Sequence, residues 1–295
     1  MEKGILNASP IFSKFIEIDG SKMHYLEAGD GDAILFLHGI PTSSYLWRNI
    51  IPMLAPLGRC IAPDLIGFGK SGKPNIEYTI FDHIRYIEKF IEVLNLNNII
   101  FVMHAWGSII GFQYAMHHEK NCKGLVFYEA FLHSLNGDSL SFPFEEQLKS
   151  WHSMENAQNI LLSGSDFIDK ALPQQIMLQL TDEALAQYRE PFLQDSSSKP
   201  ILQYLKELTD QNAKNKLAKL IEDYSTKLMQ SQLPKLMLYS VPGFITTIAT
   251  VIWAKENLPN IEITDIGEEL HLAQESNPRF MGGTISAWLQ AIQTI

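Results

Sequence analysis

Short runs of residues that would be apolar on both faces of a strand recur along this chain, and they restrict its fold more than any other feature. Four of them lie at residues 33–37, 60–63, 99–103 and 125–128. Such runs suit strands buried inside a mostly parallel sheet. Segments with apolar residues at helical spacing separate them, for example residues 81–94. Because strands alternate with helices, the sequence predicts a doubly wound α/β fold.

The alternation is interrupted once. Residues 130–216 contain amphipathic helical stretches and loops but no clear buried strand. The pattern then resumes, with helices expected at 217–229, 248–257 and 279–293 and strands at 235–239 and 261–266. We therefore predict a core formed by residues 1–129 and 217–295, with a helical cap of residues 130–216 inserted into it. An Asp19-Gly20 pair between two alternating runs predicts a hairpin near the start of the chain.

The charge balance is acidic, with 23 Lys and Arg residues against 33 Asp and Glu residues. Nucleic acid and anionic membranes attract clusters of basic residues, and the sequence has none. We therefore expect neither as a partner. The N-terminus lacks the apolar stretch of a signal peptide, and no run of about 18 apolar residues occurs. These features predict a cytoplasmic protein and leave the choice between monomer and dimer open.

Three motifs suggest a phosphate or metal site, but the residues around each of them argue against that function. Residues 67–72 match G-x-G-x-x-G, but the loop-like residues 73–75 follow where a phosphate-binding helix should begin. The similar P-loop motif needs a glycine where this chain has Asp64. His117 and His118 are adjacent, so on a helix they point about 100° apart and do not converge on a metal. We predict no nucleotide, no other cofactor and no metal.

Three segments carry residue types that hydrolytic catalysis uses, and each follows a predicted strand. They contain His38 and Ile40, then Ala105 and Trp106 at a strand-to-helix junction, then His271 after the last strand. Each alone has an ordinary explanation, because a lone His or Trp after a strand is usually packed in the core. Together and in this order they predict an α/β-hydrolase site.

In that fold a sharp turn between a strand and a helix lifts the residue at position 105 above the sheet. The backbone N–H groups of Trp106 and Ile40 would form an oxyanion site, and His271 would be the base. Gly107 and Gly111 in the following helix allow the close packing of helix against strand that this turn requires.

The chain resembles the haloalkane dehalogenases over nearly its whole length. The matching stretches are residues 38–48 (HGIPTSSYLWR), 63–71 (PDLIGFGKS), 104–108 (HAWGS), 188–192 (YREPF) and 271–278 (HLAQESNP). The related coelenterazine-type luciferases share much of this pattern. The resemblance implies an α/β-hydrolase fold with an inserted cap and an enzyme that needs no cofactor.

The resemblance also implies a mechanism. In the family an Asp carboxylate displaces halide from carbon, and a His with an acidic partner activates the water that hydrolyses the resulting ester. The halide is held by the Trp after that Asp and, in most members, by an Asn after His-Gly. The acidic partner follows strand six or strand seven of the fold. Residues 240–247, after strand seven, contain no carboxylate, so Glu129, after strand six, is the predicted partner of His271.

Two positions depart from the family pattern. Ala105 stands where the nucleophilic Asp is expected, and a methyl group cannot attack carbon. Loss of such a nucleophile typically removes about 10⁴–10⁶ of the rate. Ile40 stands where the halide-binding Asn is expected. Neither Ser108 nor His104 is expected to replace the nucleophile, because side-chain direction along helix and strand should turn both away from the site.

Three interpretations follow from these departures. The chain is a true dehalogenase disabled by an engineered Asp-to-Ala change, a diverged enzyme that uses the His271–Glu129 pair as a general base, or a binding protein without turnover. The first explains Ala105 but leaves Ile40 unexplained, and retention of the His–Glu pair argues against the third. We favour the second.

A small apolar substrate fits all three interpretations, because such sites have mainly apolar walls. Ordinary packing between cap and core is the alternative role for these side chains. The candidate wall residues are Phe142, Phe144, Phe167, Leu172, Phe244 and Ile245.

Overall fold

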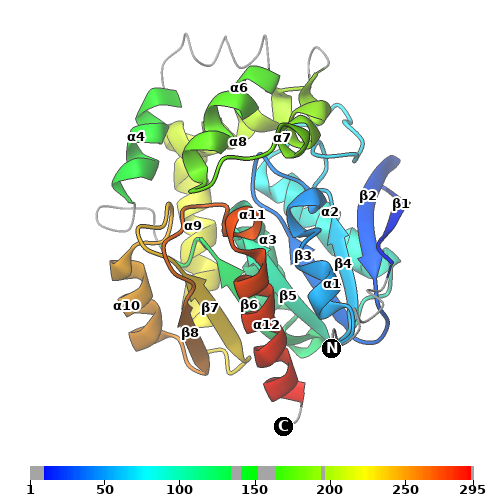
Figure 1. Cartoon of the computed structure of the whole chain (residues 1–295), viewed down its shortest axis with the longest axis vertical. Helices are drawn as coiled ribbons and strands as arrows, with labels where there is room; N and C mark the ends of the chain where they lie inside the picture. The colour runs from blue at the N-terminus through cyan, green and yellow to red at the C-terminus, as the bar shows by residue number, and fades with distance from the viewer. Residues whose placement is uncertain (1–9, 134–140, 152–163, 194–196, 294–295) are drawn as a thin grey trace, which may run out of the picture.

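The computed structural model describes residues 10–133, 141–151, 164–193 and 197–293. An eight-stranded sheet with strand order β1-β2-β4-β3-β5-β6-β7-β8 runs through it (Figure 1). Strands β3 to β8 pair in parallel, and β2 pairs antiparallel with both β1 and β4. The strands are β1 (Phe12–Ile18), β2 (Ser21–Ala28), β3 (Ala33–Leu37), β4 (Arg59–Pro63), β5 (Ile99–His104), β6 (Cys122–Tyr128), β7 (Lys235–Tyr239) and β8 (Ile261–Asp265). The predicted hairpin is confirmed as β1–β2, whose turn places Asp19 and Gly20 at positive φ.

Helices cover both faces of the sheet, as the doubly wound prediction required. Helices α1 and α12 pack together on one face, and α2, α3 and α9 lie on the other (Figure 1). The core helices are α1 (Ile51–Leu54), α2 (Ile80–Val93), α3 (Trp106–His117), α9 (Gln211–Leu228), α10 (Ile248–Asn257), α11 (Ala273–Ser276) and α12 (Pro278–Gln293). This is the α/β-hydrolase fold. None of the helices in the described ranges is long and apolar enough to cross a membrane.

A helical layer lies over one edge of the sheet, at the top of Figure 1. It comprises α4 (Phe142–Trp151), α6 (Gly164–Ala171), α7 (Asp182–Arg189) and α8 (Lys199–Thr209), with short 3₁₀ turns η4 (Leu172–Gln175) and η5 (Glu190–Phe192). Its amphipathic helices turn residues such as Ile168, Tyr188 and Ile201 inward to near-complete burial. We refer to this helical layer as the cap.

The helix expected at 217–229 begins six residues earlier, at Gln211. Asp210 caps it by accepting a hydrogen bond from the Ala213 N–H at 3.0 Å. The sequence pattern missed this first turn and a half because residues 211–216 are mostly polar and show no apolar spacing. A boundary at residue 216/217 falls inside α9, and the division into core and cap remains a prediction.

The glycine-rich loop at residues 67–72 wraps a carboxylate of its own chain. Asp64 accepts hydrogen bonds from the Ser44 and Lys70 N–H groups and from His24 Nδ1, each at 2.7 Å. A Cβ at Gly69 would lie 2.2 Å from the Asp64 carboxylate, and Gly69 has positive φ. The glycine pattern therefore has a structural explanation in the packing of the loop around Asp64.

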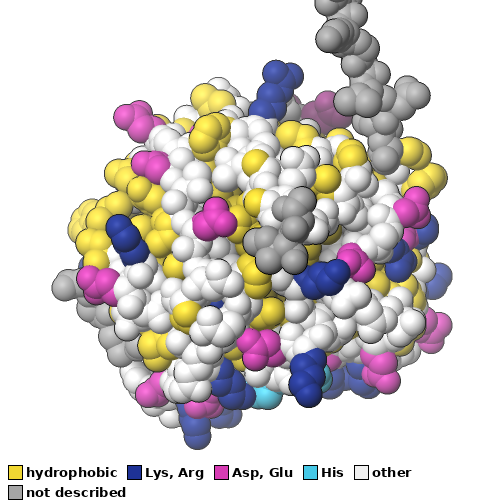
Figure 2. Space-filling view, turned by 90° about the horizontal axis from the view of Figure 1, so that it is seen from below, with side chains coloured by type: hydrophobic (Ala, Val, Ile, Leu, Met, Phe, Trp, Pro, Cys, Tyr) yellow, Lys and Arg dark blue, Asp and Glu magenta, His cyan; other side chains and the backbone are white. Residues whose placement is uncertain are grey.

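Acidic and basic side chains are interspersed across the face shown in Figure 2. In the described part of the chain, no group of three or more His, Cys, Asp and Glu side chains has the arrangement of a metal site. Cys60 and Cys122 are buried free thiols.

Gly107 permits the close approach of α3 to β3. A Cβ at this position would lie 2.4 Å from the Leu37 carbonyl oxygen and 2.8 Å from that of His38. Backbone atoms cannot move aside as a flexible side chain can. Because the first turn of α3 carries the residues of the strand-to-helix junction, this contact fixes the height of that junction above the sheet.

We predict that Gly107→Ala destabilises the fold by at least about 2 kcal/mol, because an added methyl group overpacks a backbone contact. Gly283→Ala is the matched control, since a Cβ there meets nothing within 4 Å and the residue lies within α12. The control should be neutral or more stable by up to about 1 kcal/mol. Urea unfolding measures both, and equal stability of the two variants would contradict the account.

Candidate active site

Ala105 forms a sharp junction between β5 and α3, as predicted. Its backbone has φ 46° and ψ −116°, and the residue is buried. An L-residue with a Cβ rarely adopts positive φ outside a constrained site, and doing so costs about 1–2 kcal/mol. The helix that follows holds this geometry, because the Ser108 N–H and Oγ both donate to the Ala105 carbonyl oxygen. The junction is therefore strained and locked.

The loop after β3 lies directly against this junction. A Cβ at Gly39 would come within 2.8 Å of the Ala105 Cβ, so only glycine fits there. Ile40 follows it, with a cis peptide bond to Pro41. Trp106 is the first residue of α3, and its N–H therefore has no carbonyl partner within the helix. The predicted oxyanion donors, the N–H groups of Ile40 and Trp106, come from these two neighbouring segments.

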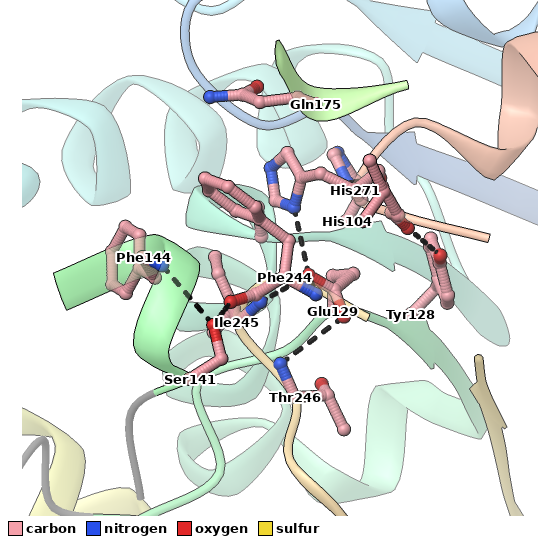
Figure 3. A network of polar contacts seen from close by, with 12 residues as sticks. His104, Tyr128, Glu129, Ser141, Phe144, Gln175, Phe244, Ile245, Thr246 and His271 are labelled. Atoms are coloured by element: carbon pink, nitrogen blue, oxygen red, sulfur yellow. Dashed lines mark hydrogen bonds and ion pairs between the residues drawn. The ribbon is translucent and has the colours of Figure 1, made fainter. Parts of the chain in front are cut away.

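Glu129 and His271 form the predicted pair. The distance from His271 Nδ1 to Glu129 Oε2 is 3.0 Å, and both side chains are almost completely buried (Figure 3). Glu129 is the residue after β6, and it also has positive φ, 53°. His271 follows the last strand by a short loop and precedes α11.

The loop after β7 holds the Glu129 carboxylate with its backbone. The N–H groups of Phe244 and Ile245 donate to Oε2, and the N–H of Thr246 donates to Oε1 (Figure 3). Gly243, with φ 66°, turns the loop so that consecutive N–H groups face the carboxylate. The sequence showed only that this loop lacks a carboxylate. Its role as a cradle for Glu129 was not predicted, and Pro242-Gly243 was the one local sign of a tight turn.

Burial governs the protonation of the pair. Loss of solvent raises the pKa of Glu129 to about 7, although the N–H groups of Ile245, Phe244 and Thr246 oppose that rise. Loss of solvent lowers the pKa of His271 to about 3. His271 is therefore a neutral imidazole at physiological pH. Because the carboxylate is surrounded by donors and acts as the acceptor, the Nδ1 of His271 carries the proton and Nε2 carries a free lone pair.

His104 does not point away from the site as expected. Its Nε2 lies 2.9 Å from the His271 carbonyl oxygen, and the two imidazole ring centroids are 4.4 Å apart. A carbonyl only accepts, so Nε2 of His104 is protonated and its Nδ1, which is buried, carries the lone pair. The ring of Tyr128 stacks on the other side of His104. His104 thus supports the main chain of His271, and side-chain alternation along β5 alone could not reveal this.

Ser108 is turned away from the site, as predicted, since its Oγ also accepts from the Phe131 N–H at 3.0 Å. Trp106 packs edge-on against Tyr204 of α8, with ring centroids 4.9 Å apart. The Trp106 Nε1 is buried and has no hydrogen-bond partner in the described ranges. It is a free donor at the junction between core and cap.

Five of the six predicted wall residues are buried. Phe244 packs on the His271 imidazole, with ring centroids 5.3 Å apart, and Phe144 packs on Phe244 at 5.7 Å. The others that are buried are Phe167, Leu172 and Ile245. Phe142 is wrong as a wall residue, because its side chain is 73 % exposed. It begins α4, and helical geometry that turns Phe144 inward turns Phe142, two residues earlier, toward solvent.

Comparisons with known proteins identify the family. An α/β-hydrolase-fold family model matches residues 32–160. The chain is 34 % identical over 290 residues to the haloalkane dehalogenase of Mesorhizobium japonicum, covering 94 % of this chain and 91 % of that protein. This chain belongs to the haloalkane dehalogenase family. It is also 34 % identical over 266 residues to the coelenterazine h 2-monooxygenase of Renilla reniformis, covering 88 % and 84 % of the two chains.

Solved structures of family members agree with this assignment. The haloalkane dehalogenase DbeA from Bradyrhizobium elkani has a TM-score of 0.91 and 31 % identity, covering 97 % of this chain and 99 % of that chain. The haloalkane dehalogenase DatA from Agrobacterium tumefaciens has a TM-score of 0.88 and 31 % identity, covering 96 % and 97 %. The fold predicted from the family resemblance is confirmed.

Gln175 is a polar residue of this dehalogenase-family site that the sequence analysis did not single out. Its backbone carbonyl accepts from the Leu272 N–H at 3.0 Å, next to His271. Its side-chain Nε2 donates to Gln147 Oε1, also at 3.0 Å. Nothing in a single sequence distinguishes this glutamine from an exposed one, because its position depends on how η4 meets the His271 loop.

We predict a pH-dependent stability contribution from His271. Its folded pKa, about 3, lies below the value of about 6.5 for an unfolded His. The folded state therefore binds fewer protons, so this contribution is present above pH 6.5 and is lost as pH falls toward 3. Between pH 7 and pH 4.5 it should amount to about 2.5 kcal/mol.

The matched variant is His271→Gln, which keeps a polar side chain but does not titrate. Urea unfolding at pH 7 and pH 4.5 should show the unaltered protein losing about 2.5 kcal/mol more than the variant. Glu129, whose pKa is raised to about 7, titrates in the same range with the opposite sign in both proteins, so the difference between the two curves is the quantity that reports on His271. Parallel pH curves for the two proteins would show that His271 is not buried as a neutral base.

Proposed function

We propose that this chain is a diverged member of the dehalogenase family that uses His271, held by Glu129, as a general base on a small and mainly apolar substrate. It needs no cofactor and does not hydrolyse carbon–halogen bonds. The observation that carries this proposal is Ala105, which occupies the strained junction beside an intact His–Glu pair. A methyl group cannot form the alkyl-enzyme ester, and the base that would act on such an ester is still present.

Neighbouring side chains do not supply a replacement nucleophile. The Ser108 Oγ donates to the Ala105 carbonyl and accepts from Phe131, so both directions of its hydroxyl are used within the helix and the next loop. His104 donates from Nε2 to the His271 carbonyl, and its Nδ1 lone pair is buried against Gly39. Chemistry at this site therefore falls to the Nε2 lone pair of His271.

The proposed step is proton removal from the substrate or from water by His271 Nε2. Glu129, which accepts from Nδ1, stabilises the imidazolium that forms. The N–H groups of Trp106 and Ile40 would stabilise negative charge that develops on the substrate. Elimination, cyclisation and water attack all fit this arrangement.

A second candidate function rests on the Trp106 Nε1, a buried donor without a partner. It is the side chain expected to hold halide, so the chain could be a true dehalogenase that carries an engineered Ala105. Ile40 argues against this candidate, because its side chain has no donor for the second halide contact. A binding protein without turnover is the third candidate, and the retained His271–Glu129 pair argues against it.

We predict no measurable bromide release from bromoalkanes by the purified protein, because no group can form the ester intermediate. Mass spectrometry after incubation with 1-bromobutane should show no added butyl group. Sustained bromide release, or a covalent adduct on this chain, would contradict the proposal.

Ala105→Asp tests the proposal against the engineered alternative. If the enzyme has diverged, the restored nucleophile still faces a leaving bromide with one donor missing. Such a deletion costs roughly 3–4 kcal/mol of transition-state stabilisation, or about 10²–10³ in rate. The single variant should be feeble, and adding Ile40→Asn should recover much of that loss.

Two outcomes separate the candidates further. Full bromoalkane hydrolysis by Ala105→Asp alone would refute divergence and support the disabled dehalogenase. No response to either change would mean that the site has been rebuilt for another substrate, which agrees with general-base chemistry or with plain binding. Initial bromide-release rates of the single and double variants provide the measurement.

A further inference from the structure

A buried polar atom in η4, the turn whose backbone bonds the His271 loop, has no hydrogen-bond partner in the described ranges. Gln175 is 4 % exposed, and its Oε1 is buried without a hydrogen-bond partner in the described part of the chain. Buried acceptors in proteins are nearly always paired, and leaving one unpaired is costly. A bound ligand with a hydrogen-bond donor would therefore supply the partner that this acceptor lacks.

Two other groups of Gln175 are bonded within the protein. Its backbone carbonyl accepts from Leu272, and its Nε2 donates to Gln147 of α4. These two bonds tie the amide between the cap and the His271 loop. Since Nε2 is committed to Gln147, Oε1 is the atom left free.

Figure 3 places Gln175 on the side of the His271 imidazole that is away from Glu129. The ring nitrogen that does not bond Glu129 is also turned away from that carboxylate. In this view Gln175 and the proposed base therefore lie on the same side of the pair. A second unpartnered atom, the Trp106 Nε1 donor, lies on the first residue of α3, whose ring packs against Tyr204 of α8.

We propose that the substrate is an apolar alcohol whose hydroxyl hydrogen is accepted by Gln175 Oε1. A hydroxyl suits this acceptor better than a halide, because a hydroxyl carries a hydrogen to donate and a halide does not. The apolar remainder suits Phe144 and Phe244, whose rings pack in succession against His271. This inference names the substrate class for the proposed function and rests on that function.

Sites built to bond a substrate hydroxyl discriminate strongly against analogues that lack it, because their own polar group is then left unpaired. Gln175 is therefore a specificity-determining residue. It takes no part in proton transfer, so its effect should appear in binding.

The test compares cyclohexanol with cyclohexanone, which is similar in size and accepts but does not donate. Dissociation constants come from NMR titration of the purified protein. Cyclohexanol should bind about tenfold more tightly, as expected for one hydrogen bond to a buried acceptor. Equal or tighter binding of cyclohexanone to the unaltered protein would overturn the proposal.

Gln175→Met keeps the volume of the side chain and removes the acceptor. It should weaken cyclohexanol about tenfold and change cyclohexanone less than about twofold. A general loosening of the cap would weaken both ligands equally and would also overturn the proposal. Gln187→Met, at an exposed position of α7, is the matched control and should change neither constant.

His271→Ala separates this inference from the proposed function. The preference for cyclohexanol should persist in that variant, because Gln175 accepts a hydrogen bond from the hydroxyl whether or not a proton is transferred. If the preference disappears in His271→Ala and survives in Gln175→Met, the base itself binds the hydroxyl. That result would contradict the proposed role of Gln175 but would agree with His271 acting as the general base.

Discussion

The hydrogen bond between His271 Nδ1 and Glu129 Oε2 is the interaction on which the rest of the site depends. This bond depends on three consecutive backbone N–H groups, from Phe244 to Thr246, that donate to the fully buried carboxylate. A buried carboxylate without such donors would cost several kcal/mol or become neutral. With these three donors in place, the Glu129 carboxylate accepts from His271 Nδ1 and so fixes the tautomer of the imidazole. The free lone pair is then on Nε2. The pair therefore depends on the loops after β6, β7 and β8, which meet at one edge of the sheet.

The same edge retains the geometry of a nucleophile elbow although Ala105 occupies it. Positive φ at Ala105 and a glycine-only contact at Gly39 are costs that a purely structural turn has no need to carry. Strain of this kind usually persists where the surrounding structure over-determines it. Here Gly107 seats α3 against β3, and the Ser108 hydroxyl holds the carbonyl of Ala105. The predicted oxyanion donors are therefore held by contacts that do not involve the residue 105 side chain.

The strand runs and their alternation with helices were enough to predict the sheet, the hairpin and a helical layer over its edge. Family resemblance then supplied the partners His271 and Glu129, and the structure brings them into contact. The features that the sequence analysis missed depend on details that apolar patterns and motifs do not record. Phe142 and the start of α9 depended on helix phase and on a polar first turn, which apolar spacing does not record. Gln175, His104 and the N–H cradle for Glu129 arise from contacts between distant segments, and one sequence carries no signal for these.

The protonation state of His271 tests the central claim most directly. Selective ¹⁵N-histidine labelling, with His271→Gln to assign the signal, reports which ring nitrogen carries the proton. The account predicts a neutral ring with the proton on Nδ1 and an unprotonated Nε2 from pH 8 down to pH 5, because burial lowers the pKa of this residue to about 3. An imidazolium at pH 7, or a neutral ring protonated on Nε2, would contradict the claim that His271 has an unprotonated Nε2 that can accept a proton.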